Sequence, residues 1–373
     1  MKKILYITTV SGTINAFLIP HIKMLLEMGY RVDCACNINN PIKKELIDMG
    51  VEIFEIDFQR NPFNKLNINA IKQIKKLQSD MDYDIIHVHT PVASIISRYA
   101  LRKFKNTKVI YTCHGFHFYK GGSIKNWLLF YPIEKIAARW TDTIITINNE
   151  DYKIAKKFKQ RNKGRVYQIN GVGIDKKEYI LNDFDKKEFR KTLELENDDF
   201  VILVLAEINE NKNHIQLIEA LNVVNKKHKN IKAVFAGEAL LKDEIMKTIK
   251  KYNLDDNIKI LGLRNDVNKL INMSDIVVLV SKREGLGKCL LEAMVCKKTV
   301  IATNTRGPRQ FVRHNENGFL VGINNIDETV NAIYKLYEDR YTKEKFEDEA
   351  IKTSNEYLLE NILKQLKKVY IDL

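Results

Sequence analysis

Short apolar segments recur along the chain, and loops and longer amphipathic stretches separate them. In the first half these segments are KKILYITT, RVDCAC, VEIFEIDF, Tyr83–His89, KVIYTCH and TIITIN. Between them, Phe17–Met28 and Ser123–Trp140 carry apolar residues at helical spacing. Strands that alternate with helices in this way are typical of βαβ units, which build a parallel sheet.

The second half repeats the pattern with more continuous apolar runs. They are FVILVLA (200–206), IKAVFAG (231–237), IKILGL (258–263), IVVLVS (276–281) and TVIATN (299–304). Such runs are typical of strands that are buried on both faces of a sheet. Helical patterns, for example His214–Lys226 and Leu290–Val295, lie between them. The sequence therefore predicts an α/β protein with two Rossmann-like, doubly wound domains.

The chain of 373 residues is long enough for two domains, each with its own core. Periodicity weakens and charge rises over Ile174–Leu195, which favours a boundary there. We expect an N-terminal domain at 1–175, a second domain at 176–350, and a helical tail at 351–373 that packs back on the first domain. Open parallel sheets bind ligands beyond the carboxyl ends of their strands, so two such domains facing each other are expected to bind across a cleft.

Targeting signals are not evident in the sequence. The start MKKILYITTV is followed by polar and glycine residues, which is typical of a buried strand rather than a signal peptide. We find no uninterrupted apolar run of about 18 residues, the length that a membrane-spanning helix needs. The five cysteines form no CxxC pair and are interpreted as reduced, buried thiols. These features favour a cytoplasmic protein.

The net charge of +14 is concentrated in the first half. Residues 1–175 carry a net charge of +12, and residues 176–373 carry +2. A basic half attracts anionic lipid surfaces and other polyanions, although a solvated lysine-rich face would have the same composition. Residues 123–140 mix basic residues with aromatic ones such as Trp127 and Phe130, which suits either a membrane interface or a helix packed on the core.

The sharpest chemical motif lies at residues 281–294. An apolar strand ends at Ser281, a loop with two glycines follows, and a helix begins. Backbone N–H groups at such a turn bind anions. Glu284 and Glu292 are eight residues apart, slightly more than two helical turns, so both can face one ligand. Paired carboxylates of this kind suit the hydroxyls of a sugar or a ribose.

The spacing from Glu284 to Glu292 resembles the E-x7-E signature of glycosyltransferase family 4, whose members are retaining enzymes with the GT-B fold. LLEAMVCKKTVIATNTRG, NGVGID, ENKNHIQLIEAL and LGLRNDVNKLINMSDIVVLVSKREGLG are similar to further segments of that family. HVHTPVASIISRYALRK and TCHGFHFYKG resemble the branch that makes capsular and exopolysaccharide repeat units. The resemblance covers residues 3–345.

The resemblance assigns roles to individual residues. It implies that Glu284, Lys212 and His114 are catalytic, with Glu284 near the donor sugar, Lys212 on the donor diphosphate and His114 reaching the transferred sugar. It implies that Glu292 holds the ribose hydroxyls. The other donor-binding positions that we expect are Gly12, Leu263, Arg264, Arg283, Gly285, Leu286, Gly287 and Lys288.

One departure from the family pattern concerns the charge at the diphosphate. The family often has an arginine where this chain has Glu207, and related polysaccharide enzymes resemble this chain in carrying an acid there. Arg283 is a candidate for supplying the missing positive charge. The departure leaves open a protein that binds a sugar nucleotide without catalysis.

The activity implied is transfer of a hexose or N-acetylhexosamine from a nucleoside diphosphate sugar, expected to be a UDP-sugar, with retention of configuration. The implied acceptor is a polyprenyl-diphosphate-linked sugar of surface polysaccharide biosynthesis. The enzyme would then lie at the inner face of the cell membrane as a peripheral protein. A UDP-sugar 2-epimerase with the same fold is the alternative enzyme.

Metals and other cofactors are not expected. Asp82 and Asp84 form a DxD pattern, but they precede a buried strand, where aspartate commonly marks strand entry. His87, His89, His114 and His117 lie at two strand ends without a nearby thiolate, which disfavours zinc. No G-x-G-x-x-G follows the first strand, which disfavours a dinucleotide cofactor. A nucleic-acid partner is not expected, since only the net charge favours one.

Overall fold

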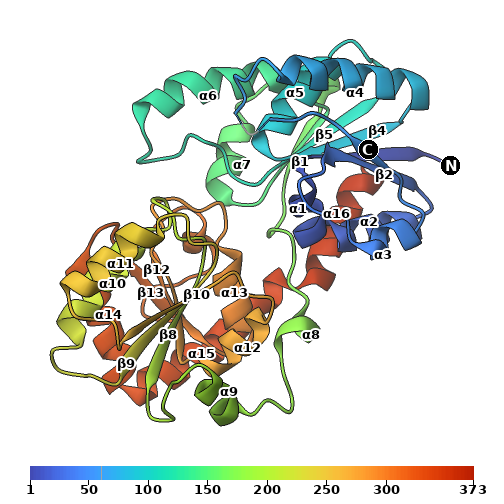
Figure 1. Ribbon diagram of the computed structural model, residues 1–373. Coiled ribbons are helices and arrows are strands. Elements are labelled where there is room, and N and C mark those ends of the chain that lie inside the picture. Colours follow the sequence, from blue (N-terminus) through green and yellow to red (C-terminus); the bar gives the residue numbers. More distant parts are fainter. Residues whose placement is uncertain (60) are drawn as a thin grey trace. The chain divides into compact units, whose positions relative to one another are not determined.

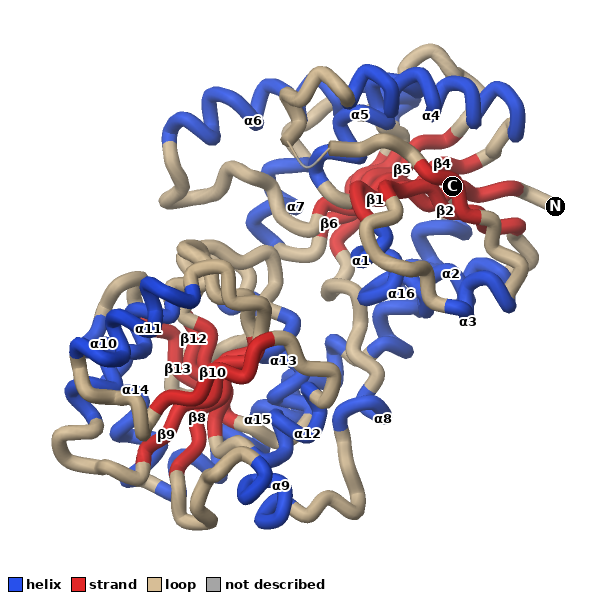
Figure 2. Tube along the Cα trace, viewed as in Figure 1, coloured by secondary structure: helices blue, strands red, loops and turns tan. Residues whose placement is uncertain are grey.

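The computed structural model describes residues 1–59 and 61–373 (Figure 1). The chain forms two compact units. One contains Met1–Val172 and Ile362–Leu373, and the other contains Gly173–Asn361. Each is an α/β unit built on a parallel sheet, as the sequence predicts (Figure 2). The chain passes from the second unit back to the first at Asn361–Ile362, and this point lies inside the predicted helical tail.

The sheet of the first unit has seven strands within the described residues, in the order β3-β2-β1-β4-β5-β6-β7. Neighbouring strands pair in parallel throughout. The strand order reverses direction between β1 and β4, as expected for a doubly wound sheet. The strands are β1 (Lys3–Val10), β2 (Arg31–Asn37), β3 (Ile53–Glu55), β4 (Ile85–His89), β5 (Lys108–Cys113), β6 (Thr143–Thr146) and β7 (Arg165–Gln168).

Helices cover both faces of this sheet. In Figure 1, α4, α5 and α6 lie on one face, while α1, α2, α3 and α16 lie on the other. The helices are α1 (Ser11–Thr13), a π-helical turn (Ile14–Leu18), α2 (Ile19–Glu27), α3 (Lys44–Asp48), α4 (Asn67–Met81), α5 (Pro91–Leu101), α6 (Ile124–Ala137), α7 (Asn149–Ala155) and α16 (Leu359–Ile371). A buried ion pair of 2.7 Å between Arg98 of α5 and Glu134 of α6 joins two of them.

The C-terminal helix α16 returns to the first unit. Its side chains at 362, 366, 369 and 370 are buried, which is the spacing of one helical face. The hydroxyl of Tyr370 lies 2.9 Å from that of Tyr6 on β1. The side chain of Gln365 accepts a hydrogen bond of 3.0 Å from the backbone of Asn170. Residues from opposite ends of the chain therefore share one core.

The second unit has a parallel sheet in the order β10-β9-β8-β11-β12-β13, within the described residues. The strands are β8 (Phe200–Leu205), β9 (Ile231–Ala236), β10 (Ile258–Gly262), β11 (Ile276–Leu279), β12 (Thr299–Thr303) and β13 (Gly318–Val321). The helices are α8 (Lys176–Tyr179), α9 (Lys186–Thr192), α10 (His214–Val224), α11 (Lys242–Lys251), α12 (Val267–Met273), α13 (Lys288–Val295), α14 (Ile326–Glu338) and α15 (Arg340–Ser354).

An aspartate directly precedes one strand in three places and ties it to its neighbour. The carboxylate accepts a hydrogen bond from the first or second backbone N–H of the adjacent strand. The pairs are Asp84 with Lys3 (2.7 Å), Asp142 with Val109 (2.8 Å) and Asp275 with Val201 (2.8 Å). Asp84 therefore has the strand-entry role that its position predicts.

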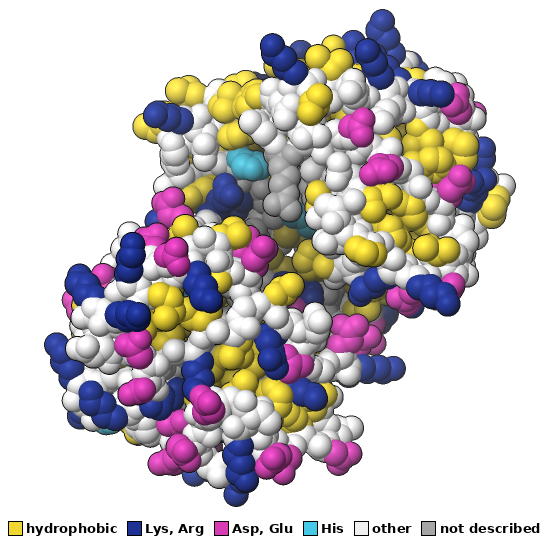
Figure 3. Space-filling view, viewed as in Figure 1, with side chains coloured by type: hydrophobic (Ala, Val, Ile, Leu, Met, Phe, Trp, Pro, Cys, Tyr) yellow, Lys and Arg dark blue, Asp and Glu magenta, His cyan; other side chains and the backbone are white. Residues whose placement is uncertain are grey.

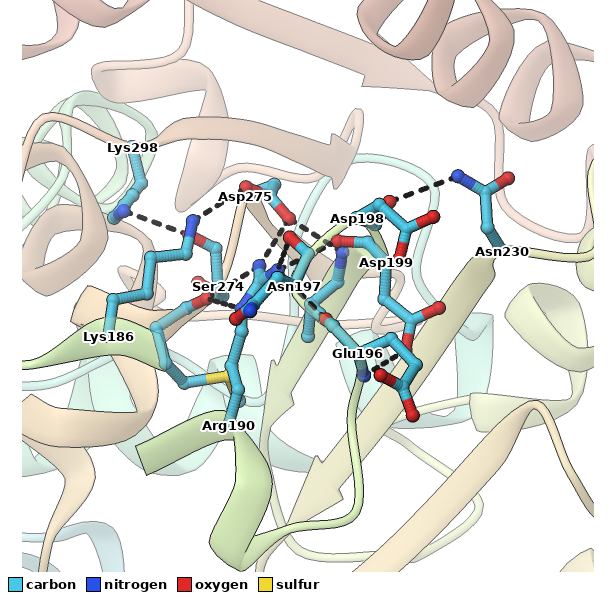
Figure 4. Close-up of polar contacts among 12 residues, drawn as sticks. Lys186, Arg190, Glu196, Asn197, Asp198, Asp199, Asn230, Ser274, Asp275 and Lys298 are labelled. Atoms are coloured by element: carbon cyan, nitrogen blue, oxygen red, sulfur yellow. Dashed lines mark hydrogen bonds and ion pairs between the residues drawn. The ribbon is translucent and has the colours of Figure 1, made fainter. Parts of the chain in front are cut away.

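A buried arginine organises the amino-terminal edge of the second sheet (Figure 4). Arg190 of α9 donates to the carbonyls of Met273 (2.9 and 3.0 Å) and Asp199 (2.9 Å), and to the Asp275 carboxylate (2.7 Å). Lys186 adds a second ion pair to Asp275 at 2.9 Å. Burial by itself would raise the pKa of Asp275, but these two cations hold it below its ordinary value.

We expect Asp275→Ala to lower the free energy of unfolding by about 3–5 kcal/mol, because it leaves the buried Arg190 charge unpaired. Urea unfolding followed by circular dichroism measures this loss. Lys191→Ala is the matched control, since Lys191 lies on the same helix and pairs with Glu188 in solvent. Equal effects of the two substitutions would contradict the role given to Asp275.

Candidate active site

The predicted anion-binding turn follows β11 in the second unit. The strand ends at Leu279, and α13 begins at Lys288. Gly287 precedes the helix with φ +88°, a left-handed conformation that favours glycine. The loop between them is tied to the loop after β8, because the backbone N–H of Lys282 donates to the carbonyl of Asn211 at 2.7 Å. The carboxyl ends of two neighbouring strands thus meet here.

Glu284 and Lys212 come together at this edge. The ammonium of Lys212 lies 2.7 Å from the Glu284 carboxylate, and both side chains are largely buried. Burial alone would lower the pKa of Lys212, but the charge of Glu284 outweighs it and raises the pKa. Lys212 is therefore a fixed positive charge in a partly dehydrated place, which suits a diphosphate.

Glu292 lies on α13 and binds two side chains. Its carboxylate accepts hydrogen bonds from the ammonium of Lys288 at 2.5 Å and from the hydroxyl of Tyr179 at 2.6 Å. Burial and the nearby Glu292 charge raise the pKa of Tyr179, so its hydroxyl stays a donor. Tyr179, at the end of α8, is absent from the sequence-based site, since no motif distinguishes it from other linker residues.

Glu207, the residue that departs from the family pattern, is hydrogen-bonded to a neighbouring side chain. Its carboxylate accepts from the side-chain amide of Asn209 at 2.7 Å. The carbonyl of that amide accepts from the backbone N–H of Lys212 at 3.0 Å. Glu207 is thereby linked to the loop that positions Lys212.

Leu263 and Arg264 lie apart from this cluster, beyond the edge strand β10. Leu263 is 80% exposed. Arg264 forms a two-point ion pair with Asp266, with distances of 2.8 and 2.6 Å. The backbone carbonyl of Arg283 accepts a hydrogen bond from Asn211 at 3.1 Å, and Leu286 is buried. The roles of these residues in donor binding remain predictions.

Gly12 and His114 belong to the first unit. Gly12 lies in α1, directly after β1, and the neighbouring Ser11 hydroxyl donates to the carbonyl of Asn40 at 2.7 Å. His114 follows β5, and its Nε2 lies 3.2 Å from Nδ1 of His89. Burial lowers the pKa of His114 to about 4, so its imidazole is neutral near pH 7.

A cavity of about 310 Å³ lies in the first unit beside the carboxyl ends of β1 and β4. Its walls are mostly apolar and include Val10, Pro62, Pro91, Ile95, His117 and Phe130. The ring of His117 stacks on Phe130, with their centroids 4.7 Å apart. Glu134, whose carboxylate pairs with Arg98, also lines the cavity, so its walls combine a flat aromatic surface with one paired carboxylate.

The apolar side chains of helix α6 are divided between a packed face and an exposed face. Trp127 and Phe130 pack against the core of the first unit, which is the second of the two alternatives that the sequence left open for this stretch. Ile124 and Leu128 are instead 75% and 74% exposed. Figure 3 shows apolar and basic side chains next to each other on this side of the unit. The helix packs through one face and exposes apolar groups on another.

The described residues contain neither a metal-binding cluster nor a membrane-spanning helix. Across 1–59 and 61–373, His, Cys, Asp and Glu side chains form no cluster of three or more that could hold a metal ion. Over the same residues, no helix is both long enough and apolar enough to cross a membrane.

Two glycosyltransferase families match successive parts of the chain. The family described as "Glycosyl transferase 4-like" matches residues 3–148, and "Glycosyl transferases group 1" matches residues 185–353. The solved structure of Anabaena HepE in complex with UDP and glucose superposes with a TM-score of 0.83 at 22% identity, covering 100% of both chains. The predicted GT-B fold, with two Rossmann-like units, is confirmed.

Sequence relatives extend over nearly the whole chain. The relative EpsD of Bacillus subtilis (strain 168) is 36% identical over 99% of this chain and 96% of its own length. The UDP-Gal:alpha-D-GlcNAc-diphosphoundecaprenol alpha-1,3-galactosyltransferase of Escherichia coli is 28% identical over 94% and 91%, respectively. The protein belongs to glycosyltransferase family 4, in its capsular and exopolysaccharide branch, and it is a transferase.

We expect Glu284→Ala and Glu292→Ala each to reduce sugar transfer by roughly 10- to 150-fold without unfolding the protein, because each removes a charged hydrogen-bond partner. Initial rates measure the loss, and thermal melting checks the fold. Glu210→Ala serves as the control, because Glu210 lies in the same loop region but is 88% exposed. Wild-type rates in both site variants would remove the two glutamates from the site.

Lys212→Ala is expected to weaken UDP binding about 10-fold or more, because it removes the buried ammonium that faces Glu284. Isothermal titration calorimetry with UDP measures the affinity. Lys282→Ala, which alters an exposed lysine of the neighbouring loop, should leave that affinity unchanged. Equal UDP affinity in wild type and Lys212→Ala would contradict the assignment.

Stability should fall as pH decreases from about 6.5 to 4. Burial lowers the pKa of His21, His114 and His214 to about 4, whereas the unfolded chain titrates near 6.5. Unfolding therefore takes up protons in this window, so the stability is fully present above pH 6.5 and is lost below it. Urea midpoints across pH 4–8 test this, and a midpoint that rises on acidification would contradict it.

Proposed function

We propose that this protein transfers a sugar from a UDP-sugar to a polyprenyl-diphosphate-linked sugar, with retention of anomeric configuration, in surface polysaccharide biosynthesis. The observation that carries the proposal is the pair of buried Glu–Lys contacts at the turn after β11. Glu284 pairs with Lys212, and Glu292 pairs with Lys288. A nucleoside diphosphate sugar offers hydroxyls to the carboxylates and phosphates to the ammonium groups.

The chemistry at this turn depends on positioning and on charge. When the sugar leaves, negative charge develops on the diphosphate, and fixed positive groups in a poorly hydrated site stabilise it. Lys212 is such a group, and the backbone N–H groups at 285–288 are oriented by the start of α13. We assign no role to a metal ion or another cofactor.

Relatives support the choice of substrates. The HepE structures contain UDP with glucose, and UDP-glucose. The Escherichia coli relative is named for UDP-Gal and for a diphosphoundecaprenol-linked acceptor. A Campylobacter jejuni relative, 28% identical over 50% of this chain, is also named for a diphospho-undecaprenol acceptor. The apolar cavity with the His117–Phe130 surface is the place we assign to the acceptor.

A lipid-linked acceptor would place the enzyme on the cytoplasmic face of the membrane as a peripheral protein. The first unit carries most of the net positive charge, and α6 exposes Ile124 and Leu128 beside Lys125. Basic residues near an anionic surface contribute about 1 kcal/mol each, and exposed apolar side chains add to this. We therefore assign the membrane contact to the exposed face of α6.

A donor screen tests the proposed reaction. UDP- and GDP-sugars are incubated with the protein and a membrane extract that contains lipid-linked sugars, and nucleotide release is measured with and without EDTA. We expect one UDP-sugar to be consumed only when acceptor is present, and chelation to leave the rate unchanged. Consumption without acceptor that yields a 2-epimer would favour the epimerase, and UDP binding without turnover would favour a non-catalytic binder.

Membrane contact has its own test. We expect the protein to sediment with anionic vesicles at low salt and to be released near 1 M salt, where the screening length is about 3 Å. Leu128→Ser should weaken sedimentation. Ile371→Ser is the matched control, because Ile371 is also an exposed apolar residue of the first unit. Binding that ignores salt and the Leu128 substitution would contradict the assignment to α6.

A further inference from the structure

Three histidine rings form a stack at the carboxyl edge of the first sheet, and two of them, His87 and His89, are fully buried. The rings of His87 and His89, both on β4, have centroids 4.2 Å apart with 29° between their planes. The ring of His114, directly after β5, follows at 5.5 Å from His89 and 28°. Tyr6 of β1 packs against both β4 rings, at 4.8 and 5.1 Å. This packing leaves the His89 ring little freedom to turn.

His87, at the β4 end of the stack, has hydrogen-bond partners for both of its ring nitrogens. Nδ1 of His87 lies 2.6 Å from the hydroxyl of Tyr370, and Nε2 lies 2.7 Å from that of Thr112. Hydroxyl groups both donate and accept, so either tautomer of His87 is satisfied. His87 therefore places no constraint on where its neighbours carry their protons.

His89 differs, because it has a partner for one nitrogen and none for the other. Its Nδ1 lies 3.2 Å from Nε2 of His114. Its Nε2 is buried and has no hydrogen-bond partner among residues 1–59 and 61–373. Burial lowers the pKa of both His89 and His114, so both rings are neutral and each carries a single N–H.

The cost of burying an N–H without an acceptor decides which nitrogen of His89 and which nitrogen of His114 carries the proton. If His114 donated from Nε2, His89 would carry its proton on Nε2, as a buried N–H without an acceptor. If His89 donates from Nδ1, its unpartnered Nε2 is only a lone pair. Orphaned buried N–H groups are rarer than unsatisfied acceptors, because a strong donor loses more on leaving water. The second arrangement is therefore the more stable one.

We propose that His89 is a positioning residue that fixes the tautomer of His114, so that His114 presents an Nδ1–H to the substrate. In the described chain, Nδ1 of His114 has no hydrogen-bond partner, and the residue is only partly buried. A fixed N–H of this kind recognises a hydrogen-bond acceptor such as a sugar hydroxyl oxygen. The role toward substrate rests on the proposed function, whereas the tautomer itself is a property of the free protein.

Nitrogen NMR of the full-length protein labelled with ¹⁵N-histidine tests the tautomer directly, because protonated and bare imidazole nitrogens have well-separated shifts. The His114 signals are assigned by their loss in His114→Phe. At pH 7 we expect the proton of His114 on Nδ1. In His89→Phe, which keeps the stacked ring, Nε2–H should become populated. A proton on Nε2 in the wild type, or an unchanged tautomer in His89→Phe, would overturn the proposal.

Kinetics separate positioning from mere packing. We expect His89→Phe to lower kcat about 10-fold, the value of one neutral hydrogen bond, at similar thermal stability. His89→Asn, whose amide can place an N–H near the former Nδ1, should restore both the Nδ1–H tautomer and most of kcat. Equal loss in both variants would contradict positioning. Full transfer activity in His114→Phe would refute the proposed role of His114 in transfer but leave the NMR result standing.

Discussion

Parallel pairing of every strand is the constraint on which the rest of this molecule depends. It puts the carboxyl ends of all strands at one edge of each sheet, so the loops after them are brought together whatever their separation in sequence. Lys212 and Glu284 meet for this reason, since they follow the adjacent strands β8 and β11. His89 and His114 meet in the same way, at the ends of β4 and β5.

Polar contacts at the amino-terminal edges of the two sheets differ in kind from those at the carboxyl edge of the second sheet. At the amino-terminal edge, the carboxylates of Asp142 and Asp275 bind backbone N–H groups and buried arginines, and these contacts stabilise the fold. At the carboxyl edge of the second sheet, Glu284 and Glu292 bind lysine side chains. Under the proposed function, a bound diphosphate would pair with these ammonium groups and sugar hydroxyls would pair with the carboxylates, so neither charge would be left unpaired.

Sequence patterns predicted the architecture because each buried strand is a continuous apolar run, and they placed the turn at 281–288 because its glycines and glutamates have fixed spacing. They did not predict Tyr179, which reaches Glu292 only through tertiary structure. They also left the placement of Trp127 and Phe130 open, since composition does not tell which face of an amphipathic helix meets the core. The tautomer that we propose for His89 likewise depends on the lack of a hydrogen-bond partner at its Nε2 among the described residues, and the sequence alone does not show this.

Retaining glycosyl transfer is the central claim, and the anomeric configuration of the newly linked sugar tests it most directly. The product formed from the active UDP-sugar and a lipid-linked acceptor is isolated, and the anomeric proton coupling of the transferred residue is compared by NMR with that of the donor. Our account predicts the same configuration in donor and product. An inverted configuration, or a product in which no sugar has been added to the acceptor, would contradict it.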